Sequence, residues 1–180
     1  PPGHEDLRAG LEAIELIGVF FGVVDPERLM RLEHVVEGPR GSGPGAKALT
    51  SVAALALAVG TRPSELAVTL AREALDGPEL FDYDPGVAVA GATQVLSLAD
   101  PAEGLRGWQR VSDNADRRGS ALDKVGADLW GGLTLLWAGD LRAADASLLR
   151  AQEGEALWGT LMAAEMGYSA GFLCLVRIER

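Results

Sequence analysis

Residues 120–150 read "SALDKVGADLWGGLTLLWAGDLRAADASLLR" and contain two helical segments joined by a short turn. Ser120, followed by Asp123, marks a helix start, because a serine hydroxyl can accept a hydrogen bond from an amide of the first helical turn. Apolar residues then recur at the spacing of an amphipathic helix: Leu122, Val125, Leu129, Leu133 and Leu136, with Trp130 and Trp137 beside them. The stretch predicts a well-buried helix over 121–138 and a second helix over 141–153.

Similar helix signals recur along the whole chain, whereas strand signals are almost absent. Three Asp-Pro pairs, at 25–26, 84–85 and 100–101, each precede an apolar-periodic run. Aspartate can cap the first turn of a helix, and proline at the next position has no amide to leave unsatisfied. We expect about nine helices, near 5–21, 26–37, 46–59, 64–76, 85–99, 101–118, 121–138, 141–153 and 156–179.

The short turns repeat at a regular interval. Ala58, Ala99 and Ala138 each precede such a turn and lie 41 and 39 residues apart. A period near 40 with two helices per unit is typical of an α-solenoid. We therefore expect an all-α fold of antiparallel helical hairpins stacked as a tetratricopeptide-like α-solenoid. The hairpins are expected to form one continuous domain. Its parts are an N-terminal hairpin and Gly-rich loop over 1–45 and a repeat region over 46–180, with hairpins near 46–76, 85–118 and 121–153 and a half hairpin over 156–180.

Glycine is frequent, with 23 residues, and several fall inside predicted helices, among them Gly91, Gly126, Gly131, Gly132, Gly167 and Gly171. A helical glycine costs about 1 kcal/mol relative to alanine, which favours a role in close helix packing. The other interpretation is that a Gly- and Ala-rich composition tolerates them. The sequence leaves both open.

Composition excludes several classes of function. The net charge of −10 argues against direct nucleic-acid binding, which requires a basic surface. No apolar run is long enough to span a bilayer. Two distant histidines, His4 and His34, lack the spacing of zinc ligands. The single cysteine, Cys174, is expected to be a small buried core residue, and its lack of an internal partner suits the cytoplasm.

Two loops were candidates for ion or phosphate binding. In "GPRGSGPGAKA", residues 38–48, Ala46 separates Gly45 from Lys47, and Ala48 stands where a phosphate-binding loop needs a hydroxyl. This segment is predicted to be a flexible connection between helices. "ELFDYD", residues 79–84, lacks the remaining ligands of a calcium loop and is predicted to be a solvated loop whose aromatic residues pack on a neighbouring hairpin.

Residues 115–159 carry a resemblance to a known family. "RRGS" opens a long helix, "GDL" closes it, "AADA" follows, and the second helix leads to Trp158. The segment resembles the tetratricopeptide-like helical region of large ATP-binding LuxR-family transcriptional regulators, signal-transduction ATPases of actinobacterial type. More loosely, the resemblance extends over residues 5–180. It implies a nucleotide-binding module upstream, a helix-turn-helix downstream, and a helical sensor or scaffold between them.

The resemblance implies that this chain is part of that cytoplasmic scaffold. Both of its ends look cut, which suggests an excised piece. It would mediate signal transduction through protein–protein contacts with other domains of the same protein, or by binding a small-molecule or protein inducer. No catalytic residue, cofactor or metal ligand is carried over, and we expect no enzymatic activity. The alternatives are a stand-alone tetratricopeptide-like adaptor that binds peptides and, with less support, an all-helical enzyme that uses paired carboxylates.

Aromatic residues are the candidate binding groups. All four tryptophans fall after residue 100, and they can either fill the space between helices or line a groove. The candidate groove contacts are Trp130, Trp137, Trp158 and Tyr168. The last helix is apolar on more than one side, through Met162, Met166, Phe172, Leu173, Leu175, Val176 and Ile178. A homodimer through this uncapped helix is therefore also expected.

Overall fold

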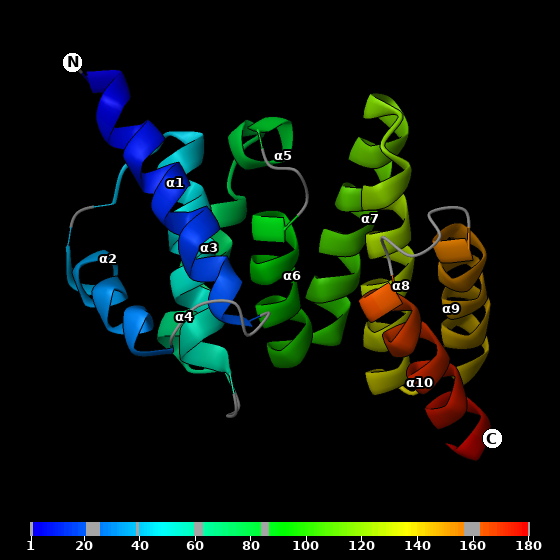
Figure 1. Cartoon of the computed structure of the whole chain (residues 1–180). Coiled ribbons are helices and arrows are strands. Elements are labelled where there is room, and N and C mark those ends of the chain that lie inside the picture. Colours follow the sequence, from blue (N-terminus) through cyan, green and yellow to red (C-terminus); the bar gives the residue numbers. More distant parts are fainter. Residues whose placement is uncertain are drawn as a thin grey trace. The chain divides into compact units, whose positions relative to one another are not determined.

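The computed structural model describes residues 2–20, 26–38, 40–59, 63–83, 87–156 and 163–179. Over these ranges the chain is all-helical, with no strand, which confirms the predicted class (Figure 1). The elements are α1 (Pro2–Phe20), η1 (Pro26–Leu32, a 3-10 helix), α2 (Glu33–Glu37), α3 (Pro44–Ala58), α4 (Glu65–Leu75), α5 (Glu79–Tyr83), α6 (Val87–Ala99), α7 (Pro101–Arg118), α8 (Ala121–Trp137), α9 (Leu141–Ala156) and α10 (Ala163–Glu179).

Helix contacts divide the chain into two compact units. Unit 1 is Pro1–Ala99 and unit 2 is Asp100–Arg180. The boundary falls inside the expected hairpin over 85–118, so α6 belongs to unit 1 and α7 to unit 2. The expected helix over 26–37 is formed by η1 followed by α2. Each unit is described by itself below.

In unit 1, α3 is the central helix and packs against α1, α4 and α6. Small residues on α3 are completely buried, among them Ser51, Ala53 and Ala54, which lets neighbouring backbones approach closely. The Ser51 hydroxyl donates a hydrogen bond of 2.5 Å to the carbonyl of Ala88 on α6. This bond satisfies a polar group in the core of unit 1.

The Gly-rich segment leads directly into α3, and the first amides of that helix are already occupied. The Asp6 carboxylate of α1 accepts hydrogen bonds from the amides of Gly45 at 3.2 Å and Ala46 at 2.9 Å. A Cβ atom on Gly45 would lie 1.9 Å from the Asp6 carbonyl oxygen, so only glycine permits this approach. The amides that could have held a phosphate therefore bind a carboxylate of the chain itself.

The prediction of a loop over 79–84 is wrong for residues 79–83, because these residues form the short helix α5 (Glu79–Tyr83). Its apolar residues Leu80 and Phe81 are buried, and the amide of Asp82 bonds to the carbonyl of Pro78 at 3.0 Å. Lys47 Nζ lies 2.7 Å from Glu79 Oε2, and this hydrogen bond lowers the pKa of the Glu79 carboxyl. Burial of two adjacent apolar side chains thus forms a helix where local composition indicated a loop. Asp84 lies outside the described residues.

Unit 2 is built from α7 to α10. Each helix packs against the next in sequence, and α10 also contacts α8. The predicted helix starts at Ser120 and Asp100 are confirmed, because Ser120 Oγ accepts from the Asp123 amide at 3.3 Å and Asp100 Oδ1 accepts from the Ala102 amide at 2.9 Å. Gly119, with φ +66°, ends α7 in the left-handed conformation that favours glycine.

Candidate functional site

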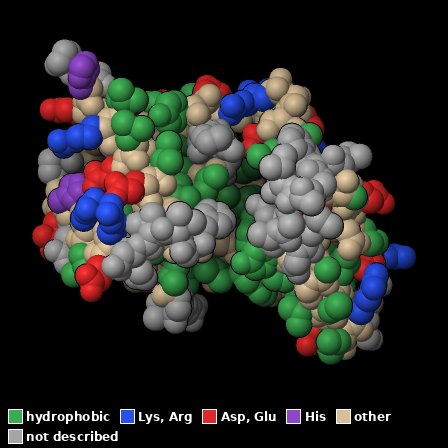
Figure 2. Space-filling view, in the orientation of Figure 1, with side chains coloured by type: hydrophobic (Ala, Val, Ile, Leu, Met, Phe, Trp, Pro, Cys, Tyr) green, Lys and Arg blue, Asp and Glu red, His purple; other side chains and the backbone are tan. Residues whose placement is uncertain are grey.

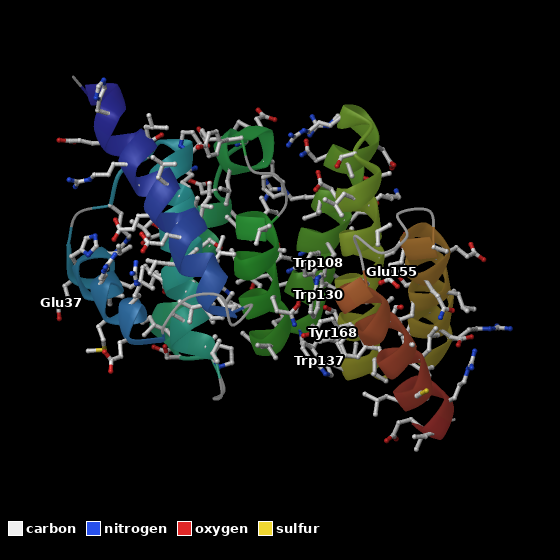
Figure 3. All side chains as sticks on the ribbon, in the orientation of Figure 1. Glu37, Trp108, Trp130, Trp137, Glu155 and Tyr168 are labelled. Atoms are coloured by element: carbon white, nitrogen blue, oxygen red, sulfur yellow. The ribbon has the colours of Figure 1, made fainter. Side chains whose placement is uncertain are left out.

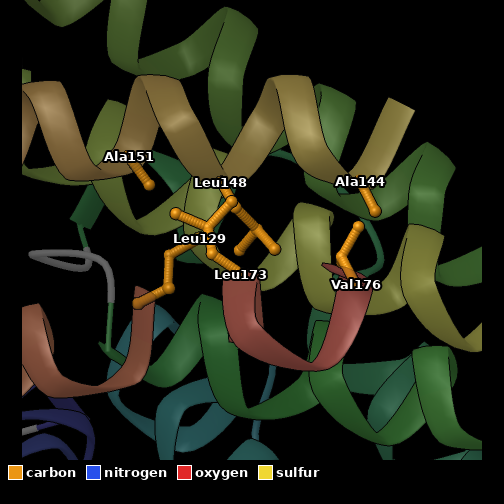
Figure 4. Packing of buried hydrophobic residues seen from close by; sticks show 6 residues of the cluster. All are labelled: Leu129, Ala144, Leu148, Ala151, Leu173 and Val176. Atoms are coloured by element: carbon orange, nitrogen blue, oxygen red, sulfur yellow. The ribbon is translucent and has the colours of Figure 1, made fainter. Parts of the chain in front are cut away.

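The site in unit 2 rests on an aliphatic core between α8, α9 and α10 (Figure 4). The buried members of this core are Leu129, Ala144, Leu148, Ala151, Leu173 and Val176. Leu129 and Leu148 are fully buried. Trp130 and Phe172 pack against this core from its edge and are only partly buried. The core therefore provides a close-packed base for aromatic residues that reach the surface.

Three rings from α8 and α10 contact one another next to this core, and Figure 3 labels two of them, Trp130 and Tyr168. The ring centroids of Trp130 and Tyr168 are 5.9 Å apart, those of Trp130 and Phe172 6.1 Å, and those of Tyr168 and Phe172 6.0 Å. All three pairs are tilted, at 44°, 59° and 33°, and these distances fall within the range of favourable aromatic contacts. We call these three residues the aromatic cluster. Tyr168 is 50% exposed, so the cluster reaches solvent.

A buried tryptophan, Trp108, links α7 to α8 by a hydrogen bond. Trp108 of α7 is 3% exposed, and its Nε1 donates to Thr134 Oγ1 at 3.1 Å. The Thr134 hydroxyl in turn donates to the carbonyl of Trp130 at 2.9 Å. Trp108 is therefore a core residue that ties α7 to α8, and it does not face a groove.

The predicted site residues are brought together only in part. Trp130 and Tyr168 are in contact, and Phe172, which the site prediction omitted, joins them. Its position four residues after Tyr168 on a helix is the signal that could have identified it. Trp137 is 43% exposed and makes no ring contact within the part of the chain that the structure describes. Trp158 lies outside the described residues.

The prediction that the helix over 121–138 is well buried is wrong at its two ends. Leu122 is 41% exposed and Trp137 is 43% exposed, whereas Leu129 and Leu133 are buried. The middle turns of α8 are therefore buried, and its first and last turns reach solvent.

A buried carboxyl group, that of Glu155, bonds to Ser169, the residue that follows Tyr168 of the aromatic cluster. Glu155 of α9 is fully buried, and Ser169 Oγ of α10 donates to its Oε2 at 2.6 Å. Its Oε1 has no hydrogen-bond partner among the described residues. Burial raises the pKa of the Glu155 carboxyl, and the hydrogen bond from Ser169 offsets part of this rise. Sequence reasoning missed this pair, because a glutamate on a polar helix carries no signal of burial.

The outer side of α10 is apolar and open to solvent. Leu175 is 48% exposed and Ile178 is 77% exposed, and hydrophobic side chains gather around the C-terminal end of α10 in Figure 2. Cys174 is exposed, so its predicted burial is wrong. Leu173 and Val176 take the inward positions of this helix, and the residue after Leu173 turns about 100° away from the core.

Within the described ranges, no group of three or more His, Cys, Asp or Glu side chains could hold a metal ion. None of the helices described in the structure is long and apolar enough to cross a membrane.

Comparisons of the chain with protein-family models, with curated proteins and with solved structures find no match.

Proposed function

We propose that this chain is a helical-repeat sensor and scaffold segment of a LuxR-type transcriptional regulator, and that unit 2 binds an apolar segment of a partner protein. The observation that carries the binding role is the aromatic cluster, in which three rings are in mutual contact on a packed core and one ring is half exposed. Exposed aromatic residues that are held rigidly are the usual anchors of protein interfaces.

The surface around the cluster indicates the chemistry of the partner. Residues 168–176 of α10 contain no charged residue, and Trp137, Leu175 and Ile178 add exposed apolar area in the same unit. An apolar or aromatic peptide segment gains most from such a surface, because contact removes apolar area from water on both sides. A highly charged ligand would lose hydration without gaining a partner there.

We also propose that the helices form antiparallel hairpins of a tetratricopeptide-like solenoid. The support is that α7, α8 and α9 each pack on the next helix in sequence, the nearest-neighbour pattern of repeat proteins. In the cytoplasm, a partner that binds one arrangement of these helices more tightly than another would shift the regulator toward that arrangement.

The binding role is tested by panning a phage-displayed library of random peptides against the full chain. Selected peptides are then synthesised and titrated by tryptophan fluorescence. We expect Tyr168→Ala to weaken binding at least about tenfold, as loss of an interface anchor does. Tyr83→Ala is the matched control, because Tyr83 is 46% exposed and lies in unit 1. Peptides that bind Tyr168→Ala as tightly as the parent chain, or no enrichment of any peptide, would refute the binding role.

The regulator context has a separate test. The complete reading frame is expected to encode a Walker A motif before this segment and a basic helix-turn-helix after it. A frame that encodes neither would exclude the regulator while leaving the binding role of unit 2 to the peptide experiment.

A further inference from the structure

The first helix of unit 1 has a second apolar side that none of the described residues of the unit covers. Leu7, Leu11 and Ile14 are 56%, 60% and 60% exposed. The opposite side of α1 packs on α3, with Ala13 and Leu16 buried. We call Leu7, Leu11 and Ile14 the α1 stripe. Hydrophobic side chains gather along α1 at the upper left of Figure 2, beside basic and acidic ones.

The spacing of the α1 stripe fits another helix. Leu7, Leu11 and Ile14 are separated by four and three residues, which is the alternation of a coiled-coil seam. His4 and Gly18 continue the same alternation at the two ends. A seam of this kind packs best against a helix that carries the same alternation, because each side chain then enters a gap between four residues of the partner.

The charges beside the stripe indicate which helix this is. Arg8 follows Leu7 and Glu15 follows Ile14, so the two charged residues hold equivalent heptad positions, seven residues apart. When two such helices pack antiparallel, this position of one helix faces the same position of the other. Arg8 of one copy therefore lies opposite Glu15 of the second copy, and a twofold axis makes this contact twice.

Both charged side chains reach solvent, and Glu15 already pairs with two arginines of its own chain. The Glu15 side chain is 38% exposed and is held in place by Arg28 and by Arg31, whose Nη1 is 3.6 Å from Glu15 Oε1. Arg8 has no hydrogen bond or ion pair within the described residues. Glu12, one turn before Glu15, adds a second carboxylate near the incoming Arg8. In a parallel pair, Arg8 would instead face Gly3 and Glu15 would face Gly10, and neither glycine carries a charge.

A membrane surface fits the stripe less well. Helices that lie on membranes carry Lys and Arg beside their apolar side. Arg8 is the single lysine or arginine of α1, whereas the helix carries four acidic residues: Glu5, Asp6, Glu12 and Glu15. Anionic lipids would repel this helix and the chain as a whole, whose net charge is −10.

We propose that the α1 stripe is a self-association surface on which α1 of a second copy of this chain packs antiparallel. The surface lies wholly in unit 1 and is independent of the binding role of unit 2. Self-association would present two copies of the chain, and hence two partner-binding surfaces, in one assembly.

The test is sedimentation velocity of the full chain over a series of concentrations. We expect a reversible dimer whose dissociation constant rises at least about tenfold in Leu11→Glu, because dimerisation would bury an unpaired charge at the centre of the seam. Ile178→Glu tests the competing surface, because Ile178 is 77% exposed on the apolar side of α10, through which a homodimer is also expected. The proposal predicts that Ile178→Glu dimerises like the parent chain. A chain that stays monomeric at every concentration, or a dimer lost in Ile178→Glu and kept in Leu11→Glu, would overturn it.

Cross-linking tests the antiparallel arrangement. In a Cys174→Ser background, copies with Arg8→Cys are mixed with copies with Glu15→Cys and oxidised. A disulfide-linked dimer is expected in the mixture and not in either variant alone. Cross-linking within one variant, or none in a mixture that still dimerises, would overturn the antiparallel arrangement. Circular dichroism of each variant verifies that it is folded.

Discussion

Gly132 and Gly126 lie on the same helix, α8, yet the same substitution should have opposite effects at the two positions. A Cβ atom on Gly132 would lie 2.8 Å from Leu148 Cγ and 2.9 Å from its Cδ2, whereas one on Gly126 would meet nothing within 4 Å. Leu148 is fully buried in the core of unit 2. It has no room to move away from a new methyl group on α8.

The magnitudes follow from these contacts. Replacing a helical glycine by alanine stabilises a helix by about 1 kcal/mol, so Gly126→Ala should raise the free energy of unfolding by about that amount. At Gly132 the same gain is opposed by overpacking, which costs about 1–3 kcal/mol. The new Cβ would press on the branched Cγ of the buried Leu148, so we expect an overpacking cost near the upper end of this range. We expect Gly132→Ala to lower the free energy of unfolding by about 1–2 kcal/mol.

The assay is urea unfolding followed by tryptophan fluorescence, because all four tryptophans lie in unit 2. A double-variant cycle with Leu148→Ala identifies the cause, since that change removes the atoms in conflict. Leu148→Ala alone should cost about 2–5 kcal/mol, and adding Gly132→Ala to it should cost less than in the parent chain. Equal stabilisation by Gly126→Ala and Gly132→Ala, or strictly additive effects with Leu148→Ala, would refute the close-packing argument.

Three further predictions concern polar groups. Because the pKa of Glu155 is raised above 4.5 by folding, the folded chain binds this proton more tightly than the unfolded chain. The contribution of Glu155 to stability is therefore greatest at acid pH and is lost as pH rises through the raised pKa. Glu155→Gln should lack this fall, so its stability relative to the parent should increase from pH 4.5 upward in urea unfolding; a difference that does not change with pH would contradict this. Asp6→Ala should cost about 1 kcal/mol through loss of its two hydrogen bonds to the start of α3, measured by circular dichroism during urea unfolding, and an unchanged midpoint would argue against the cap. Trp108→Phe should cost about 1–2 kcal/mol by removing the bond to Thr134, whereas Trp137→Phe at an exposed position should change stability by less than about 0.5 kcal/mol; equal effects in thermal unfolding would contradict their assignment to core and surface.

Much of the helical architecture could be predicted because its signals are local. The start of α8 depends on Ser120 and the amide of Asp123, and the start of α7 depends on Asp100 and the amide of Ala102. These partners lie within three residues of each other, so a short window of sequence contains the whole interaction. The helix α5 was missed because its stability comes from burial of Leu80 and Phe81, which no short window reveals.

The candidate site was predictable only in its residue types. Aromatic side chains and their helical spacing pointed to Trp130 and Tyr168, but the contact between them joins α8 to α10, 38 residues apart. Glu155 gave no signal, since a glutamate on a polar helix is usually exposed. Its burial depends on α10 packing across α9, which only the tertiary structure contains.

The sequence by itself determined where α7 and α8 begin, because capping bonds and apolar spacing act between near neighbours in the chain. Tertiary structure decided which side of each helix is covered. It buries Leu173 and leaves Cys174 exposed, and it makes Gly132 a contact point while Gly126 stays open. The physical reason is that burial and close approach depend on atoms from distant parts of the chain, whose positions are set only when the helices pack together.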